Sequence, residues 1–345
     1  MKIKATKSAL IESLQMVQNV VSTKASALPI LSHVLLSTSK KDTLFMTTTD
    51  IDVSVQCSME VEVVKAGGGA LPVRRFFSII RELPDSTIEI ETDDKNNGTV
   101  KCGSSYFKIN GLSEDEFPAV EKVDNEYSYR VEQGAFRNML KRTAYAVSTD
   151  ETRYVLNGVY MSFKDKKLTM VATDGRRLAL SECEVDVPKG AEAELIMPTK
   201  TVTELLRTLA DEGELKIYLK KNKIMLEYGK VMIVSKLIEG AYPNYKQVIP
   251  GQCEERITIE REILHTALKR VSLITTDKAS AAKLTFAKNK LTVSTNTPDV
   301  GEGIETIPIK YSGKSISVAF NPEFVMDPLK NLANDEIYIE LTDDL

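Results

Sequence analysis

Three stretches of the chain decide the fold: KIKATKSALIESLQMVQNVVSTK at 2–24, YRVEQGAFRNMLKRTAYAVSTDE at 129–151 and RITIEREILHTALKRVSLITTDK at 256–278. Each opens with alternating polar and apolar residues, typical of a strand, and continues with apolar residues at helical spacing. These apolar residues are Leu10, Leu14, Val17 and Val21, then Phe136, Leu140, Ala144 and Val147, and finally Leu264, Leu268 and Val271. The chain therefore contains a threefold repeat that begins with a strand and an amphipathic helix.

The sequence after each of these helices repeats as well. Strand pairs are predicted around the turn centres Lys41-Asp42, Lys164-Asp165 and Lys288-Asn289. A second helix then opens at a proline, as at Pro72 and Pro198, and further strands follow it. Each copy spans about 120 residues in the order β-α-β-β-β-α-β-β-β. This order predicts an α+β fold in which an antiparallel sheet packs on one side of two helices.

Polar, turn-like residues separate the copies and predict three domains, at 1–125, 126–252 and 253–345. The third copy is shorter than the others. About 45 positions separate Pro72 from Pro118, and the same separation recurs between Pro198 and Pro243. Only 24 positions follow Asn321, the equivalent start of the last helix. We therefore expect the third domain to lack the final strand pair of the other two.

Composition excludes several classes of protein. The 345 residues are 42% hydrophobic and 27% charged, which is ordinary for a globular protein. No run of about 18 apolar residues exists, and the N-terminus carries charges, so neither a membrane span nor a signal peptide is expected. The four cysteines lie far apart and there are only two histidines. This usage predicts a cytoplasmic protein without disulfides, metal or cofactor.

The formal net charge of −4 conceals a segregation of charge. The six predicted helical windows, 7–21, 74–83, 134–147, 199–210, 262–274 and 322–332, hold twelve Lys or Arg residues and six acidic ones. The helices are thus +6 and the rest of the chain −10. A positive helical face on an acidic body favours binding of a polyanion on one surface only.

Eight motifs, in order and at the right spacing, resemble the bacterial DNA polymerase III beta subunit family of sliding clamps. They are LPIL (28–31), TTDI (48–51), LPVRRFF (71–77), DEFPAV (115–120), RYVLNG (153–158), VATDGRRLAL (171–180), MPTKTVTELLRTL (197–209) and VSKLIEGAYPNYKQVIP (234–250). The resemblance implies three tandem clamp domains and a homodimeric, head-to-tail ring around duplex DNA. It also implies a processivity factor without catalytic residues, whose helices face the pore and whose sheets lie outside.

The resemblance and the helical charges together name the expected DNA-binding residues. Arg74 and Tyr154 match the family, and Lys24 stands one position from the family's basic loop. The helical cations complete the set: Arg137, Lys141, Arg142, Lys200 and Arg207. Such a ring needs only contacts to phosphates, which carry no sequence information.

The resemblance also implies two protein interfaces. A cleft for short peptide motifs of DNA polymerase, the clamp loader and other clamp-binding proteins is expected at Arg153, Leu156, Thr173, Gly175, Arg176, Leu178, Pro243 and Val248. The dimer interface is expected to place Phe107 and Ile109 of one protomer against Leu273 and Ile274 of the other. In the family the C-terminal strand and tail form one wall of the cleft, and the third copy lacks the equivalent sequence.

Two other functions compete with that of a sliding clamp. An enzyme is disfavoured because the chain has no GxxxxGK[ST], HExxH or GxSxG motif. Gly67-Gly68-Gly69 is expected to be a flexible loop, and Asp50 and Asp174 to be equivalent turn residues of two repeats. A protein-binding scaffold that does not encircle DNA remains the alternative.

Overall fold

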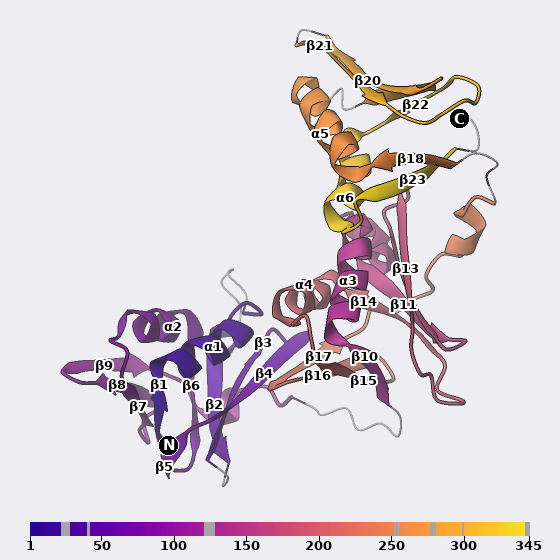
Figure 1. Ribbon diagram of the computed structural model, residues 1–345. Helices are drawn as coiled ribbons and strands as arrows, with labels where there is room; N and C mark the ends of the chain where they lie inside the picture. The colour runs from indigo at the N-terminus through magenta and orange to yellow at the C-terminus, as the bar shows by residue number, and fades with distance from the viewer. Residues whose placement is uncertain are drawn as a thin grey trace. The chain divides into compact units, whose positions relative to one another are not determined.

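The structure, a computed structural model, describes residues 1–21, 28–39, 42–120, 128–251, 253, 256–276, 281–298 and 300–341 (Figure 1). Contacts divide the chain into two compact units. Unit 1 consists of Met1–Leu140, Val147–Val171 and Leu180–Ala241. Unit 2 consists of Lys141–Ala146, Ala172–Ala179 and Tyr242–Leu345.

All six predicted helices are present, and each is short. They are α1 (Lys7–Val17), α2 (Val73–Glu82), α3 (Gln133–Thr143), α4 (Thr199–Thr208), α5 (Arg261–Val271) and α6 (Pro322–Asn331). The two helices of the first repeat, α1 and α2, pack against each other, and so do α5 and α6 of the third (Figure 1).

Antiparallel strands make up most of the rest. The first repeat contains β1 (Lys2–Thr6), β2 (His33–Ser39), β3 (Thr43–Thr49), β4 (Val53–Glu60), β5 (Glu62–Lys65), β6 (Gly68–Pro72), β7 (Thr87–Thr92), β8 (Asn97–Cys102) and β9 (Ser105–Asn110). The second contains β10 (Ser128–Glu132), β11 (Gly158–Lys164), β12 (Lys167–Thr173), β13 (Leu178–Glu184), β14 (Ala193–Pro198), β15 (Glu214–Lys220), β16 (Lys223–Tyr228) and β17 (Val231–Lys236). The third contains β18 (Arg256–Glu260), β19 (Ala282–Ala287), β20 (Lys290–Thr297), β21 (Gly301–Pro308), β22 (Ile316–Phe320) and β23 (Glu336–Glu340).

Strand pairing repeats three times and confirms the internal repeat. The first strand of each copy pairs with the strand after its second helix, in the registers Ile3↔Ile90, Val131↔Leu215 and Ile257↔Ile339. The strand before that helix likewise pairs with the first strand of the central hairpin: β6 with β2, β14 with β11 and β22 with β19. The same α+β unit is therefore built three times.

One sheet joins the first two repeats. Its order is β10-β15-β16-β17-β4-β3-β2-β6, so β17 of the second repeat pairs antiparallel with β4 of the first. The register runs from Val231↔Cys57 to Ser235↔Val53. All of these strands lie in unit 1, so the first two repeats share continuous backbone hydrogen bonding.

The predicted apolar faces of α1 and α5, the helices that open the first and third repeats, are buried. Leu10, Leu14 and Val17 are fully inaccessible, and Val271 is only 2% exposed. The second copy differs from its predicted periodicity. The α-helix ends at Thr143 and continues as a 3-10 turn over Ala144–Ala146. A 3-10 turn has three residues per turn, so Thr143 and Ala146 are buried there in place of Ala144 and Val147.

The expected loop at Gly67-Gly68-Gly69 is wrong for two of its residues. Gly68 and Gly69 begin strand β6 and pair with β2. A Cβ on Gly68 would lie 1.7 Å from a carboxylate oxygen of Glu114, and one on Gly69 would lie 2.9 Å from Thr92 Cγ2. At Gly69 the short Thr92 side chain packs directly on the strand, whereas at Gly68 an added Cβ would meet chiefly the flexible end of the Glu114 side chain.

Among the described residues, β23 pairs only with β18, whereas its counterpart β7 pairs with both β1 and β8. The proposed boundary at 125/126 and Gln252 lie outside the described residues. Within the described parts of the chain, no helix has both the length and the apolar character needed to cross a membrane.

Candidate nucleic-acid and partner interfaces

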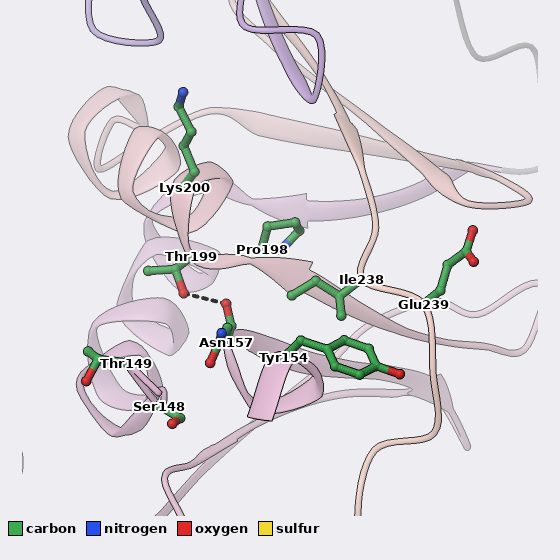
Figure 2. Close-up of a pocket in the computed structure, with 9 residues that line it drawn as sticks. All are labelled: Ser148, Thr149, Tyr154, Asn157, Pro198, Thr199, Lys200, Ile238 and Glu239. Carbon is green, nitrogen blue, oxygen red and sulfur yellow. Dashed lines mark hydrogen bonds between the residues drawn. The ribbon is translucent and has the colours of Figure 1, made fainter. Parts of the chain in front are cut away.

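An open groove of about 680 Å³ lies on the second repeat, and two of the predicted DNA-binding residues line it. Figure 2 shows its lining, which consists of Ser148, Thr149, Tyr154, Asn157, Pro198, Thr199, Lys200, Ile238 and Glu239. Hydroxyl and amide groups gather toward one end, and the only carboxylate, Glu239, lies at the other (Figure 2).

The start of helix α4 forms one wall of this groove. Pro198 ends β14, has a φ of −60° and a ψ of 145°, and gives the helix no side-chain cap. The Thr199 backbone N–H and hydroxyl both donate to the Asn157 carbonyl, at 3.2 and 2.6 Å. The Asn157 side-chain amide donates to the carbonyls of Ser148 and Asp150, each at 3.0 Å. An uncapped helix start presents backbone N–H groups that favour anions.

Tyr154 stands on the other wall with 58% of its surface exposed. It belongs to the 3-10 segment Glu151–Leu156, whose N-cap Asp150 accepts from the N–H and hydroxyl of Thr152. These hydrogen bonds lower the pKa of Asp150, the Thr152 hydroxyl most strongly. Sequence reasoning missed Gly240. At a φ of 131°, a Cβ there would lie 2.8 Å from Val155 and 3.3 Å from the Tyr154 hydroxyl.

Three predicted DNA-binding cations have donors engaged within unit 1. Arg137 donates to the Leu209 carbonyl at 2.9 Å and pairs with Asp211. Lys200 donates to the Val20 carbonyl at 2.9 Å and pairs with Asp50. Arg207 binds two backbone carbonyls of α1. The helical position of these cations was predicted correctly, but the structure shows partners inside the protein.

Arg74, Lys141 and Arg142 behave differently. All three are exposed. None has a carboxylate within 4.0 Å among the described residues. Lys141 and Arg142 lie in the last turn of α3, where the helix dipole favours positive charge. Lys24, the remaining predicted contact, lies outside the described residues.

The eight residues predicted for the peptide cleft fall in both units. In unit 1, Arg153 is 3.5 Å from Asp150, and Leu156 is only 8% exposed. In unit 2, Val248 is 68% exposed, and Pro243 and Arg176 are also exposed. Thr173 and Leu178 are half-buried.

Gly175 forms the tip of the turn between β12 and β13. Its φ is 84°, and its N–H is 3.0 Å from the Thr173 hydroxyl oxygen, which accepts the hydrogen bond. The carboxylate of Asp174 accepts from the N–H groups of Arg176 and Arg177, at 2.9 and 3.0 Å. Burial raises the pKa of Asp174, but these hydrogen bonds and the Arg177 guanidinium outweigh burial and lower it overall.

Arg177 is a central residue of unit 2 that sequence reasoning missed. Its guanidinium is 2.7 Å from both the Asp327 carboxylate and the Tyr145 carbonyl, and 3.1 Å from Asp174. It also stacks 4.5 Å from the centre of the Phe324 ring. Arg177 is the second arginine of the motif VATDGRRLAL, so the sequence did draw attention to this position. The sequence alone does not show which of the two adjacent arginines points into the protein.

The four predicted interface residues differ widely in exposure. Phe107 on edge strand β9 is 40% exposed, Leu273 is 77% exposed and Ile274 is half-buried. Ile109 is 3% exposed and belongs to the core of its own unit. Ile109 therefore faces the core of its own protomer, whereas Phe107, two residues away on the same strand, is exposed.

Comparison with known proteins follows the same three repeats. Sequence profiles of the DNA polymerase III beta subunit match residues 1–121 (N-terminal domain), 130–244 (central domain) and 246–345 (C-terminal domain). The chain belongs to this family. Its function is therefore that of a DNA sliding clamp, a non-catalytic subunit, in a three-domain clamp fold.

Individual relatives agree over almost the whole chain. The beta sliding clamp of Chlamydia muridarum is 33% identical over 99% of this chain and 93% of its own. That of Pseudomonas putida is 31% identical over 98% and 92%. The crystal structure of the Bartonella birtlesii clamp bound to griselimycin superposes with a TM-score of 0.94 at 31% identity, over 100% of this chain and 93% of its own.

Proposed function

We propose that this clamp forms a homodimeric ring and holds duplex DNA through Arg74, Lys141, Arg142 and Tyr154. The observation that carries this proposal is the group of exposed cations on α2 and α3 without carboxylate partners among the described residues. Unpaired cations can attract phosphates without first breaking an internal ion pair. Contacts of this kind are weak and screened by salt, which suits a protein that slides.

The groove beside Tyr154 extends this DNA surface. The uncapped start of α4 offers backbone N–H groups, and Ser148 and Thr149 add hydroxyls within the same groove. This chemistry fits a phosphate, and the exposed Tyr154 ring fits a sugar or base. Lys24 remains a proposed contact from the resemblance alone.

We further propose domain limits of 1–125, 126–252 and 253–345; the matched profiles cover 1–121, 130–244 and 246–345, so the first proposed limit falls between two profiles and the second lies inside the third profile. We also propose a cytoplasmic location. All four cysteines, Cys57, Cys102, Cys183 and Cys253, are free, as a reducing compartment favours.

Topology gives the decisive experiment for encirclement. The protein is loaded onto nicked circular duplex by a bacterial clamp loader, and half of the sample is then linearised. A ring stays on circles and slides off linear ends, so retention should fall sharply on linearisation. Equal release from circular and linear DNA would contradict encirclement and favour a scaffold that binds proteins without encircling DNA.

We propose that the peptide motifs of polymerase and clamp loader bind at Arg153, Leu156, Thr173, Gly175, Arg176, Leu178, Pro243 and Val248. Exposed apolar surface at Val248 and close backbone approach at Gly175 support this assignment. A glutamine-led hydrophobic peptide provides the test. Val248→Asp should weaken its binding at least tenfold, whereas Val64→Asp, a change at another exposed valine, should not.

A further inference from the structure

One face of α4 carries three charged residues, of which Lys200 and Arg207 contact the first repeat. Lys200, Glu204 and Arg207 stand at positions i, i+4 and i+7, so they share one side of the helix. Glu204 is only 6% exposed in its side chain and lies 2.6 Å from Arg207 Nη2. This buried carboxylate fixes the direction in which the guanidinium points.

Arg207 completes the hydrogen bonding at the end of α1. A helix leaves its last four carbonyls without helical partners. In α1, the Leu14 carbonyl accepts from the Gln18 N–H at 3.0 Å, and the Val17 carbonyl accepts from the Thr48 hydroxyl at 2.6 Å. The other two carbonyls, of Gln15 and Met16, accept from Arg207 at 2.7 and 3.0 Å.

The last turn of α1 has no basic residue of its own. A cation at this end of a helix is favoured by the helix dipole. The second repeat therefore supplies, through Arg207, the charge that the first repeat lacks.

Lys200 makes a second connection about two helical turns from Arg207. Its ammonium donates to the Val20 carbonyl at 2.9 Å and pairs with Asp50. The other oxygen of Asp50 accepts from the N–H groups of Asp52 and Val53, at 3.1 and 2.7 Å. Lys200 thus binds the residue that organises the turn between β3 and β4.

A pocket of about 460 Å³ lies between α1, β4 and the second repeat. Its lining consists of Ala9, Glu12, Ser13 and Met16 on α1, Cys57, Met59 and Glu60 on β4, and Gln133, Thr208, Ala210 and Tyr228–Val231 on the second repeat. Outside this pocket, the polar contacts of α4 and the β17–β4 pairing connect the two repeats.

The equivalent residues of α2 show that this arrangement is specific to the junction. Arg74 and Arg81 occupy the positions of Lys200 and Arg207. Among the described residues, Arg74 is exposed without a carboxylate partner, and the ion pair of Arg81 is with its neighbour Glu82 on the same helix. Unit 2 contains an ion pair of the same kind with the charges reversed. Between the first two repeats, Asp50 of a turn pairs with Lys200 of a helix, whereas in unit 2 Arg177 of the β12–β13 turn pairs with Asp327 of helix α6.

We propose that Lys200, Glu204 and Arg207 form a clasp that fixes the first repeat on the second, and that Lys200 and Arg207 are positioning residues and not DNA contacts. The clasp is defined by intrachain contacts alone. Only its consequence for the ring, a fixed angle between two consecutive repeats, rests on the proposed function.

Hydrogen exchange of the DNA-free protein tests the clasp. Backbone amides of β17 and β4 pair across the junction and report its opening, whereas those of β7 and β8 report only the first repeat. Arg207→Ala should speed exchange of the junction strands at least tenfold and leave β7 and β8 unchanged. The matched control Arg81→Ala should change neither. Unchanged junction exchange, or equal acceleration in all four strands, would overturn the proposal.

A double-variant cycle separates a specific clasp from general destabilisation. Asp50→Asn, which keeps an acceptor oxygen for the Asp52 and Val53 N–H groups, and Lys200→Met should each speed junction exchange, and the double variant should be no faster than the faster single variant. A double variant as fast as the sum of the single effects would contradict a direct Lys200–Asp50 pair.

Salt dependence of binding to a duplex oligonucleotide tests the second half of the proposal. Removing a phosphate contact lowers the slope of log K against log salt by about 1. Arg74→Ala should do so, and Arg207→Ala should not. A lower slope for Arg207→Ala would overturn its positioning role. An unchanged slope for Arg74→Ala together with fast junction exchange in Arg207→Ala would remove the Arg74 contact and keep the clasp.

Discussion

Ile51 occupies a backbone conformation that β-branched residues rarely adopt. Its φ is 82°, and its counterpart in the second repeat, Gly175, has a φ of 84°. The two turns are otherwise alike, because the side-chain hydroxyls of Thr49 and Thr173 accept from the N–H groups of Ile51 and Gly175 at the same 3.0 Å. The first repeat therefore keeps the turn with a residue that is strained in it.

Replacing this residue should stabilise the protein. Ile51 is 49% exposed, so Ile51→Gly loses little buried surface while it relieves the left-handed strain. The free energy of unfolding should rise by about 1 kcal/mol. This is the strain energy that the glycine relieves, reduced by the greater conformational entropy that a glycine gives the unfolded chain. Ile51→Ala, which stays in the same conformation, should gain clearly less. Denaturant titration of both variants is the measurement, and a destabilised Ile51→Gly would contradict the reasoning.

His33 makes stability depend on pH. Burial lowers the pKa of His33 below 6.5, against the opposing effects of the Pro29 carbonyl and the Glu116 charge. The unfolded chain binds the proton more readily, so this contribution is present above pH 6.5 and is lost as the pH falls below it. Unfolding measured between about pH 7.5 and 5 should show a smaller loss of stability in His33→Gln than in the parent. Equal losses would exclude His33 as the cause.

At the scale of elements, the sequence predicted more of the backbone than of the side-chain contacts. The spacing of Leu10, Leu14 and Val17 places them on one side of a helix, whatever that side packs against, so α1 was predictable from the sequence. The cations were predicted on helices for the same reason. Their partners were not predictable, because Arg81 and Arg207 have the same side chain at equivalent positions of two repeats and differ only in what lies beside them.

The contacts of Arg177 between elements were likewise not predictable from the sequence, and they can be tested by mutation. Its side chain is 19% exposed and joins the β12–β13 turn to α6 through Asp327, which is 25% exposed. Arg177→Ala leaves the Asp327 carboxylate and the Tyr145 carbonyl without this donor and should cost about 2 kcal/mol of unfolding free energy. The adjacent Arg176→Ala, at an exposed position, should cost less than about 0.5 kcal/mol. Thermal or denaturant unfolding is the measurement. If the two variants lose the same unfolding free energy, the contacts of Arg177 with Asp327 and Tyr145 do not stabilise unit 2.

At the scale of the whole molecule, the proposed dimer depends on side chains that unit 2 leaves exposed. Leu273 is 77% exposed, so its removal should not disturb the fold. Leu273→Ala with Ile274→Ala should raise the dissociation constant of the dimer at least ~10-fold. Sedimentation velocity over a dilution series is the measurement, with Val64→Ala as a control at another exposed apolar residue. An unchanged profile would place the interface elsewhere. Ile109→Ala, by contrast, should lower stability, because Ile109 is buried within its own protomer.

The β17–β4 pairing has a practical consequence for dissecting this chain. Cutting between residues 125 and 126 would release a fragment in which Val53–Cys57 has lost its hydrogen-bonding neighbour. A bare strand of this kind recruits other chains, so the fragment should self-associate or precipitate. Truncation studies of the N-terminal third will therefore need β17 supplied, for example as a peptide of residues 231–236 fused through a linker.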